Sequence, residues 1–174
     1  MIKKLALIIG FIICLSSCGK DYVYRIEGEL SNLEDQTVYA VFEKDNYKVV
    51  DTVVCTKPGQ FQIDQNEAGF HCVTIFFADK EHWVTAYLEP GETVKITGDA
   101  NSPLLLQVKG GRTNDKLTAF KKKIAPLLTE LTNLSNSLNS KDLNDTIEET
   151  DIAARLANVN MQLSEEAIRY VKEN

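Results

Sequence analysis

Four cysteines and two histidines are the residues of this 174-residue chain best suited to nucleophilic, redox or metal chemistry. A redox dithiol needs two thiols about one helical turn apart, with the first at a helix N-terminus. Cys55 and Cys72 are far apart and lie on expected strands, so they form neither a Cys-x-x-Cys pair nor a paired metal knuckle. Cys72 follows His71 directly, and neighbouring side chains on a strand face opposite sides. The sequence therefore predicts no catalytic residue, no metal ligand and no cofactor.

Three alternatives stay open from the residues alone. The fold could bring His71, Cys72 and Cys55 together as a soft metal site. Lone strand histidines, His82 included, are more often surface or packing residues. Cys55 and Cys72 could instead form a disulfide in an oxidising compartment, although we favour two small buried residues in adjacent strands. An acid–base pair could come from the strand carboxylates Glu27, Glu29 and Asp51.

The N-terminus is typical of a secretion signal. Lys3 and Lys4 precede an apolar run that ends at Leu15, shorter than the roughly 20 residues that span a bilayer. The next residues, Leu15-Ser16-Ser17-Cys18, resemble the lipobox of bacterial lipoproteins. This resemblance implies that residues 1–17 are removed and that the thiol of Cys18 carries a diacylglyceryl group. The two acyl chains of that group make the membrane attachment stable, and the freed amine would usually be acylated later.

The charge balance of the chain is acidic. Asp and Glu number 25 against 19 Lys and Arg, for a net charge of −6, and removal of Lys3 and Lys4 makes it two units more negative. Such a chain is a poor candidate for binding nucleic acid or anionic lipid head groups. We expect membrane attachment through the lipid alone. The signal for export to the cell surface is a run of acidic residues after the lipidated cysteine. The short tether of residues 18–21 contains only one acidic residue, Asp21, and this favours the periplasmic face.

Residues 22–111 have the pattern of a β-sandwich. Apolar and polar residues alternate along 22–30, and later runs are rich in β-branched residues. Turns at Pro58-Gly59 and Pro90-Gly91 separate two of these runs. Strands are expected at 22–30, 37–42, 47–55, 61–63, 70–78, 83–88, 94–96 and 104–108. Several short strands with such turns are typical of an antiparallel sandwich or a partly open barrel.

Residues 112–174 have the pattern of a helical hairpin, so the predicted fold class is α+β. Thr113 or Asn114 is expected to cap the first helix, and Pro126 to kink it. Thr146, with Glu149 three residues later, is expected to open the second helix as a capping box. Two apolar stripes at helical spacing predict antiparallel packing. They comprise Leu117, Phe120, Ile124, Leu127, Leu131, Leu134 and Leu138, and Ile152, Leu156, Val159, Leu163, Ala167 and Tyr170.

A series of short motifs carries a further resemblance. The series is Gly28, Asp51, Gly59-x-Phe61, Leu88-Glu89-Pro90-Gly91 and Val108-x-Gly110-Gly111. In this order, and behind a lipobox, it resembles the uncharacterised β-domain that precedes a thioredoxin-like domain in many Bacteroidetes lipoproteins. Those proteins are similar to membrane-anchored thiol–disulfide oxidoreductases of the TlpA/ResA kind. The resemblance covers residues 23–120, and the helices that follow look like the linker before the catalytic domain.

The resemblance implies a supporting function for this chain. A thioredoxin-like domain would supply Trp-Cys-x-x-Cys and a cis-proline, whereas Trp83 is followed by Val84. We therefore expect a non-catalytic accessory or spacer module of such an oxidoreductase, whose partner is a thioredoxin-like domain or another envelope protein. One alternative is a glycan- or peptide-binding lipoprotein that uses an exposed sheet face. Its aromatic candidates are Phe70, Phe76, Phe77, Trp83 and Tyr87. Another is a periplasmic enzyme with a site that the sequence does not show.

One modification site is also expected from resemblance. Asp51-Thr52-Val53 and Asp145-Thr146-Ile147 are similar to the Asp-Ser/Thr-apolar sequon of Bacteroidetes O-glycosylation. The second copy lies in an expected exposed loop, so Thr146 is the better candidate.

Overall fold

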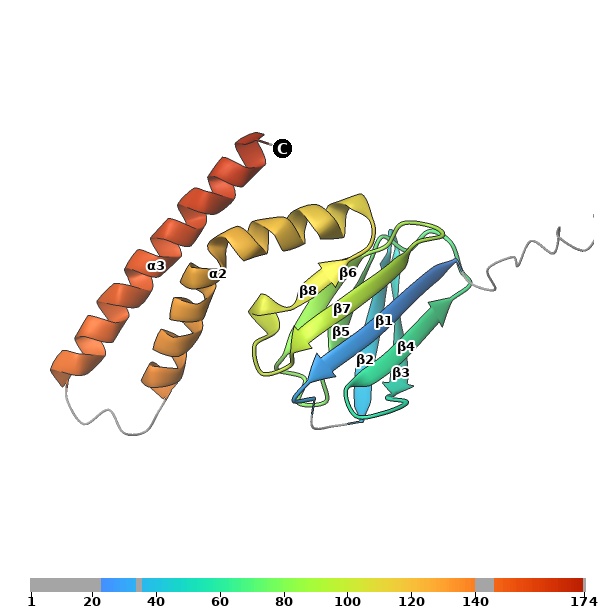
Figure 1. Cartoon of the computed structure of the whole chain (residues 1–174), viewed down its shortest axis with the longest axis horizontal. Helices are drawn as coiled ribbons and strands as arrows, with labels where there is room; N and C mark the ends of the chain where they lie inside the picture. The colour runs from blue at the N-terminus through green and yellow to red at the C-terminus, as the bar shows by residue number, and fades with distance from the viewer. Residues whose placement is uncertain (1–22, 34–35, 140–145, 174) are drawn as a thin grey trace, which may run out of the picture.

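The computed structural model describes residues 23–33, 36–139 and 146–173, and within them eight strands form two packed four-stranded sheets (Figure 1). The strands are β1 (Tyr24–Ser31), β2 (Thr37–Lys44), β3 (Tyr47–Val54), β4 (Gln60–Gln65), β5 (Cys72–Phe76), β6 (Trp83–Tyr87), β7 (Thr93–Asp99) and β8 (Gln107–Lys109). One sheet has the order β4-β1-β7-β8 and the other β3-β2-β5-β6. The predicted α+β sandwich is confirmed.

The predicted alternation places one side of every strand in a common core. In β1 the buried positions include Ile26 and Leu30, and in β2 they include Phe42. The two sheets bury their inner faces in a single hydrophobic cluster. Neighbouring strands are antiparallel with one exception, because β1 pairs with β7 in parallel. Alternation along a strand fixes which face is buried but not which strand lies beside it.

Gly28 makes room for an aromatic ring within this core. It lies on the inner side of β1, directly opposite Phe61 of β4. A Cβ atom built on Gly28 would lie 2.1 Å from Cε1 of Phe61. The absence of a side chain at Gly28 is therefore what allows the Phe61 ring to lie over the strand.

Two expectations from the sequence are wrong in detail. Residues 104–108 do not form one strand, since Pro103–Leu105 is a short 3-10 helix, η3, and β8 begins only at Gln107. Pro103 fixes φ and has no N–H to give to a ladder, which suits the first position of a helical turn. The strand expected from Phe70 begins at Cys72 and ends at Phe76, and Phe70 and Phe77 flank it as buried residues.

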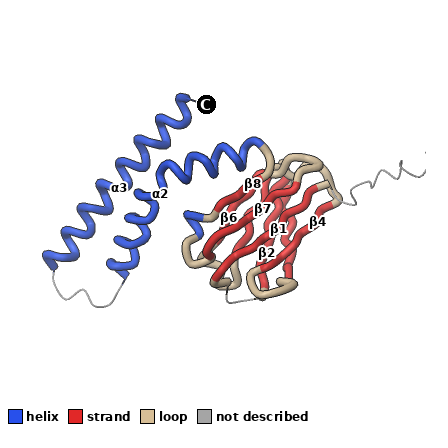
Figure 2. The backbone as a smooth tube through the Cα atoms, in the orientation of Figure 1, coloured by secondary structure: helices blue, strands red, loops and turns tan. Residues whose placement is uncertain are grey.

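Two long helices, α2 (Arg112–Asn139) and α3 (Thr146–Glu173), form the predicted hairpin beside the sandwich (Figure 2). Leu134, Ile152 and Val159 form the centre of their own apolar cluster. The kink expected at Pro126 is present, because α2 changes direction sharply midway along its length in Figure 1. A proline inside a helix removes one backbone hydrogen bond and clashes with the preceding turn. The second half of α2 therefore runs along α3, away from the sheets.

The start of α2 is fixed to both sheets by two buried polar side chains. Asn114 accepts a hydrogen bond from the Tyr87 N–H at 2.8 Å and donates to the Tyr87 carbonyl at 2.7 Å. Its amide also donates to the carbonyl of Gly110. One turn later, the Thr118 hydroxyl bonds the N–H and carbonyl of Val108. We call Asn114 and Thr118 the edge clamp, because they satisfy the backbone at the open edges of β6 and β8.

The edge clamp corrects the cap expected at Thr113 or Asn114. The first helical hydrogen bond runs from the Asp115 N–H to the Gly111 carbonyl, so Gly111 is the N-cap residue. Asn114 lies in the first turn and bonds a strand edge instead of the helix end. The capping box expected at Thr146 is not described, because its side chain and Asp145 lie outside the described residues, although α3 does begin at Thr146.

Candidate functional site

The outer faces of the two sheets differ in chemistry. The face of β4-β1-β7-β8 is polar, with ion pairs between Arg25 and Asp64 at 2.7 Å and between Lys95 and Glu27 at 3.6 Å. An open hollow of about 320 Å³ on this face is lined largely by such polar groups, Glu29 among them. Side chains of this kind are the usual solvated surface of a sheet, so the polar face needs no ligand to explain it.

The outer face of β3-β2-β5-β6 is charged at one end, where Lys48 pairs with Glu43, and carries apolar and aromatic side chains over the rest of the sheet. Antiparallel register places Tyr39 of β2 level with Phe76 of β5, and Phe76 level with Trp83 of β6. The three rings therefore form one row across three adjacent strands. A second row of β-branched residues lies beside it. We call this surface the aromatic face, and it comprises Tyr39, Val41, Val50, Thr74, Phe76, Trp83, Thr85 and Tyr87.

The aromatic face is open to solvent in the described structure. Trp83 is 54% exposed and Val50 62% exposed. The rings of Phe76 and Trp83 lie 6.1 Å apart at a 40° tilt. An open hollow of about 350 Å³ is lined by Tyr39, Val50, Phe76 and Lys80. Exposed patches of contiguous apolar side chains mark interaction sites more often than scattered single residues do.

A single cation lines this hollow within the described residues. Lys80 belongs to the turn between β5 and β6 and takes a positive φ of 59°. Its Nζ lies 5.2 Å from the centre of the Tyr39 ring, close enough for a cation–π contact. The hollow therefore combines flat apolar walls with one positive charge.

The aromatic residues named from the sequence divide between core and surface. Phe76, Trp83 and Tyr87 lie on the aromatic face, whereas Phe70 and Phe77 are buried in the core. Tyr39 was missed. The available signal was that residues 38–42 are apolar at every position, which indicates a strand that is apolar on both faces.

The two cysteines of the sandwich are free and well separated. The Cys55 N–H bonds the carbonyl of Gln36, whereas Cys72 is paired in register with Glu43. Gln36 and Glu43 are seven residues apart along one chain segment, about 23 Å at 3.3 Å per residue. A disulfide needs Cα atoms within about 7 Å. The expectation of two buried cysteines in adjacent strands is also corrected, because β2 lies between β3 and β5 and Cys72 faces outward, half-buried.

The surroundings of both thiols disfavour the thiolate form, which is the nucleophile. Burial raises the pKa of Cys55. Burial, together with the neighbouring Glu43 carboxylate, raises the pKa of Cys72 to about 11. The Cys72 thiol donates to Glu43 Oε2 at 3.2 Å. A redox-active cysteine needs the opposite, a pKa lowered by positive charge or a helix N-terminus.

We expect the substitution Glu43→Gln to speed alkylation of Cys72 at pH 8. Removing the carboxylate charge lowers the thiol pKa, and each unit of lowering raises the thiolate fraction about tenfold below the pKa. The measurement is the rate of iodoacetamide labelling, followed by peptide mass spectrometry. In the unchanged protein the rate should climb up to about pH 11. Glu29→Gln on the polar face is the control, and an equal rate change there would contradict this assignment.

The histidines and the candidate carboxylates do not converge. His71 Nε2 lies 2.9 Å from Asp45, and His82 Nδ1 pairs with Asp79. Among the residues that the structure describes, no three His, Cys, Asp or Glu side chains gather as a metal site. Glu27 and Glu29 lie on the polar face of β1. Asp51 lies on the inner side of β3, where its carboxylate accepts a hydrogen bond from Gln65 at 2.6 Å. The acid–base alternative therefore finds no shared site.

Two expected modification sites fall beyond what can be described. Cys18, with the signal peptide and tether, lies outside the described residues, and so does the side chain of Thr146. For the helices that are described, none is long and apolar enough to cross a membrane.

Comparison with known proteins places the sandwich in a protein family. The sequence model of a family described as a domain of unknown function, DUF4369, matches residues 24–117. The match spans the sandwich and ends inside α2, just before Thr118. No curated protein and no solved structure matches the chain.

Proposed function

The chain belongs to the DUF4369 family, and from this premise we propose that it is a lipid-anchored, non-catalytic module of the bacterial cell envelope. In this proposal Cys18 carries the lipid, and the sandwich stands at the periplasmic side of the membrane. The module acts as an accessory or spacer for a thioredoxin-like thiol–disulfide oxidoreductase, either a further domain or a separate partner.

The surroundings of the two sandwich thiols support the part of this proposal that assigns thiol–disulfide exchange to another domain or protein. Cys55 is buried, Cys72 lies beside a carboxylate, and the pKa of each is raised. Neither thiol suits dithiol exchange, which proceeds through a thiolate. Redox chemistry in this architecture would therefore belong to a partner's thiols.

The short tether supports the anchoring part. Tyr24, the first residue of β1, follows Cys18 by six residues, which span at most about 21 Å when extended. The Val23 carbonyl accepts a hydrogen bond from the Gly91 N–H, so the turn of residues 89–92 lies at the same end of the sandwich. A lipid on Cys18 would hold this end close to the bilayer. The row of Tyr39, Phe76 and Trp83 lies near the other end of the sheets.

The lipid anchor is tested by substituting Cys18→Ser. We expect the unchanged protein in the membrane fraction, with the added mass of a diacylglyceryl group, because the thiol is the alkylated atom. The variant should lose that mass and remain unprocessed. Cys14→Ser, inside the expected signal, is the matched control and should behave as the unchanged protein. An unlipidated mature protein would contradict the proposal.

The accessory role has its own test. We expect a sequence encoding Trp-Cys-x-x-Cys either in frame after the codon for Asn174 or in a neighbouring gene. A product carrying that motif should be recovered with this chain after crosslinking in intact cells. The control is a variant of this chain without the sandwich, residues 22–111. If the same product were crosslinked equally well to this variant, the sandwich would have no role in positioning the product.

The aromatic face supports a second candidate function, the binding of a glycan or an extended peptide. Aromatic rings offer flat apolar area to sugar rings and to peptide side chains at low entropic cost. Trp83 is the chain's sole tryptophan, so its fluorescence reports directly on this face. Titration with soluble glycans, peptidoglycan fragments and extended peptides should shift Trp83 emission for the class that binds.

We expect Phe76→Ala to weaken any such binding about tenfold, because it removes the central ring of the row while leaving the reporter Trp83 in place. The measurement is the dissociation constant from Trp83 fluorescence. Gln62→Ala on the polar face is the control and should leave the constant unchanged. Equal affinities for the Phe76→Ala and unchanged proteins would exclude the aromatic face as the binding site.

A further inference from the structure

Helix α3 carries a second apolar stripe that α2 does not cover. Its large members are exposed, with Met161 56%, Ile168 56% and Val171 76% exposed. Together with three small exposed residues they recur at alternating steps of three and four, the spacing of a coiled-coil seam. We call this the outer stripe, and it consists of Ala154, Ala157, Met161, Ser164, Ile168 and Val171.

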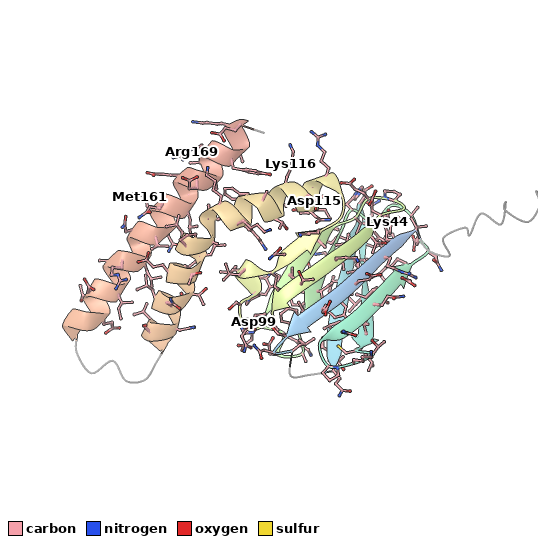
Figure 3. All side chains as sticks on the ribbon, viewed as in Figure 1. Lys44, Asp99, Asp115, Lys116, Met161 and Arg169 are labelled. Carbon is pink, nitrogen blue, oxygen red and sulfur yellow. The ribbon has the colours of Figure 1, made fainter. Side chains whose placement is uncertain are left out.

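The outer stripe and the stripe packed against α2 lie on nearly opposite sides of α3. At 3.6 residues per turn, Met161 is far around the helix from Val159 and Leu163, which belong to the α2–α3 apolar cluster. In Figure 3, α3 is the element farthest from the sandwich, and Met161 is labelled along it. The outer stripe is therefore accessible without any change in the hairpin.

We propose that the outer stripe binds the same stripe of a second copy of this chain, with the two α3 helices antiparallel. The stripe is self-complementary in that direction. With Met161 opposite Ser164 of the second copy, Ile168 lies opposite Ala157 and Val171 opposite Ala154. The six residues of the stripe thus form six layers, and in each layer a large side chain lies opposite a small one. This pairing lets the two helices approach closely, and the large side chains fill the space between them.

Charge complementarity supports this register. Antiparallel pairing brings Asp151 near Lys172 of the second copy, and the two-fold symmetry repeats the pair. On the same side of the outer stripe, Glu165 lies near Asn158 of the second copy, so no two like charges are in contact. The other flank is formed by Ala153, Asn160 and Ala167, which are uncharged. The four helices of the two hairpins would then lie side by side in the order α2, α3, α3, α2, with the two α3 helices at the centre.

The test is the oligomeric state of the full-length chain, purified in detergent and measured by sedimentation equilibrium. We expect a dimer. Ile168→Glu should raise the dissociation constant at least about 100-fold, since each dimer would bury two carboxylates in place of two isoleucines. The helix content from circular dichroism should not change, because Ile168 is exposed in the single chain. The matched control is Val50→Glu on the aromatic face, which should leave the dimer intact.

A charge exchange tests the antiparallel direction. Asp151→Lys alone and Lys172→Asp alone should each weaken the dimer, and the double variant should restore it. In a parallel dimer these positions are about 30 Å apart at 1.5 Å per residue, so no restoration would occur. A monomer at every concentration would overturn the proposal. A dimer that survives Ile168→Glu but not Val50→Glu would overturn it too, because the contact would then lie on the sheet.

Discussion

Replacing Gly28 with alanine is expected to lower the free energy of unfolding by about 3 kcal/mol, the upper end of the usual cost of overpacking a core. The added Cβ would lie 2.1 Å from Cε1 and 2.2 Å from Cζ of Phe61. Phe61 is 3% exposed and enclosed by the sheets, so its ring has little room to move away. Urea unfolding, followed by circular dichroism, measures the change.

Two companion variants isolate the cause. Gly91→Ala adds the same methyl group where no atom lies within 4 Å, so only its positive φ of 80° opposes it, at a cost of about 1 kcal/mol. In a Phe61→Leu background, Gly28→Ala should cost less than it does alone, because the flexible leucine can move aside. An equal cost in both backgrounds would show that Phe61 is not what excludes a side chain at Gly28.

The sequence was sufficient to predict the sandwich and the hairpin because each depends on a local period. Apolar and polar residues alternate along β1 and β4 because one face of each strand is buried. Apolar residues recur at steps of three and four along α2 and α3 because one side of each helix is buried. Pro126 gave the kink for the same reason, since its effect is confined to its own turn.

Features that depend on distant partners could not be predicted in this way. An asparagine just after Gly110-Gly111 is compatible with capping the helix, and only the tertiary structure places Asn114 against the Tyr87 backbone. The aromatic face likewise requires the strand order. Tyr39, Phe76 and Trp83 become one row only because β2, β5 and β6 are neighbours.

The motif series that indicated the family consists largely of residues that the fold itself requires. Gly28 accommodates Phe61, and Gly59 approaches the Leu30 carbonyl so closely that a Cβ would lie 1.9 Å from the oxygen. Gly110 has a φ of 99° and lies against the Thr93 carbonyl in the same way. These positions specify the sandwich and the entry to α2. The backbone requirements at these glycines account for their place in the series without a ligand or partner.

Replacing Asn114 with alanine is expected to lower the free energy of unfolding by about 3 kcal/mol. The change leaves the N–H and carbonyl of Tyr87 and the carbonyl of Gly110 without their partner. A buried group left unpaired costs about 1–3 kcal/mol, and these part-buried groups belong at the low end of that range. Alanine's better helix propensity, about 0.5 kcal/mol, offsets a small part. Hydrogen exchange should show faster exchange of the Tyr87 amide, because its acceptor is the Asn114 side chain.

Asn133→Ala on the exposed side of α2 is the matched control. It removes the same amide from the same helix, but away from the sheets, and should leave stability unchanged or slightly raised. Thr118→Val should act as Asn114→Ala does, with exchange increased at Val108 of β8 instead of Tyr87 of β6. If α2 instead docked through apolar contacts alone, Asn114→Ala and Asn133→Ala would have the same small effect. A large difference between them would show that hydrogen bonds to the strand edges attach the hairpin to the sandwich.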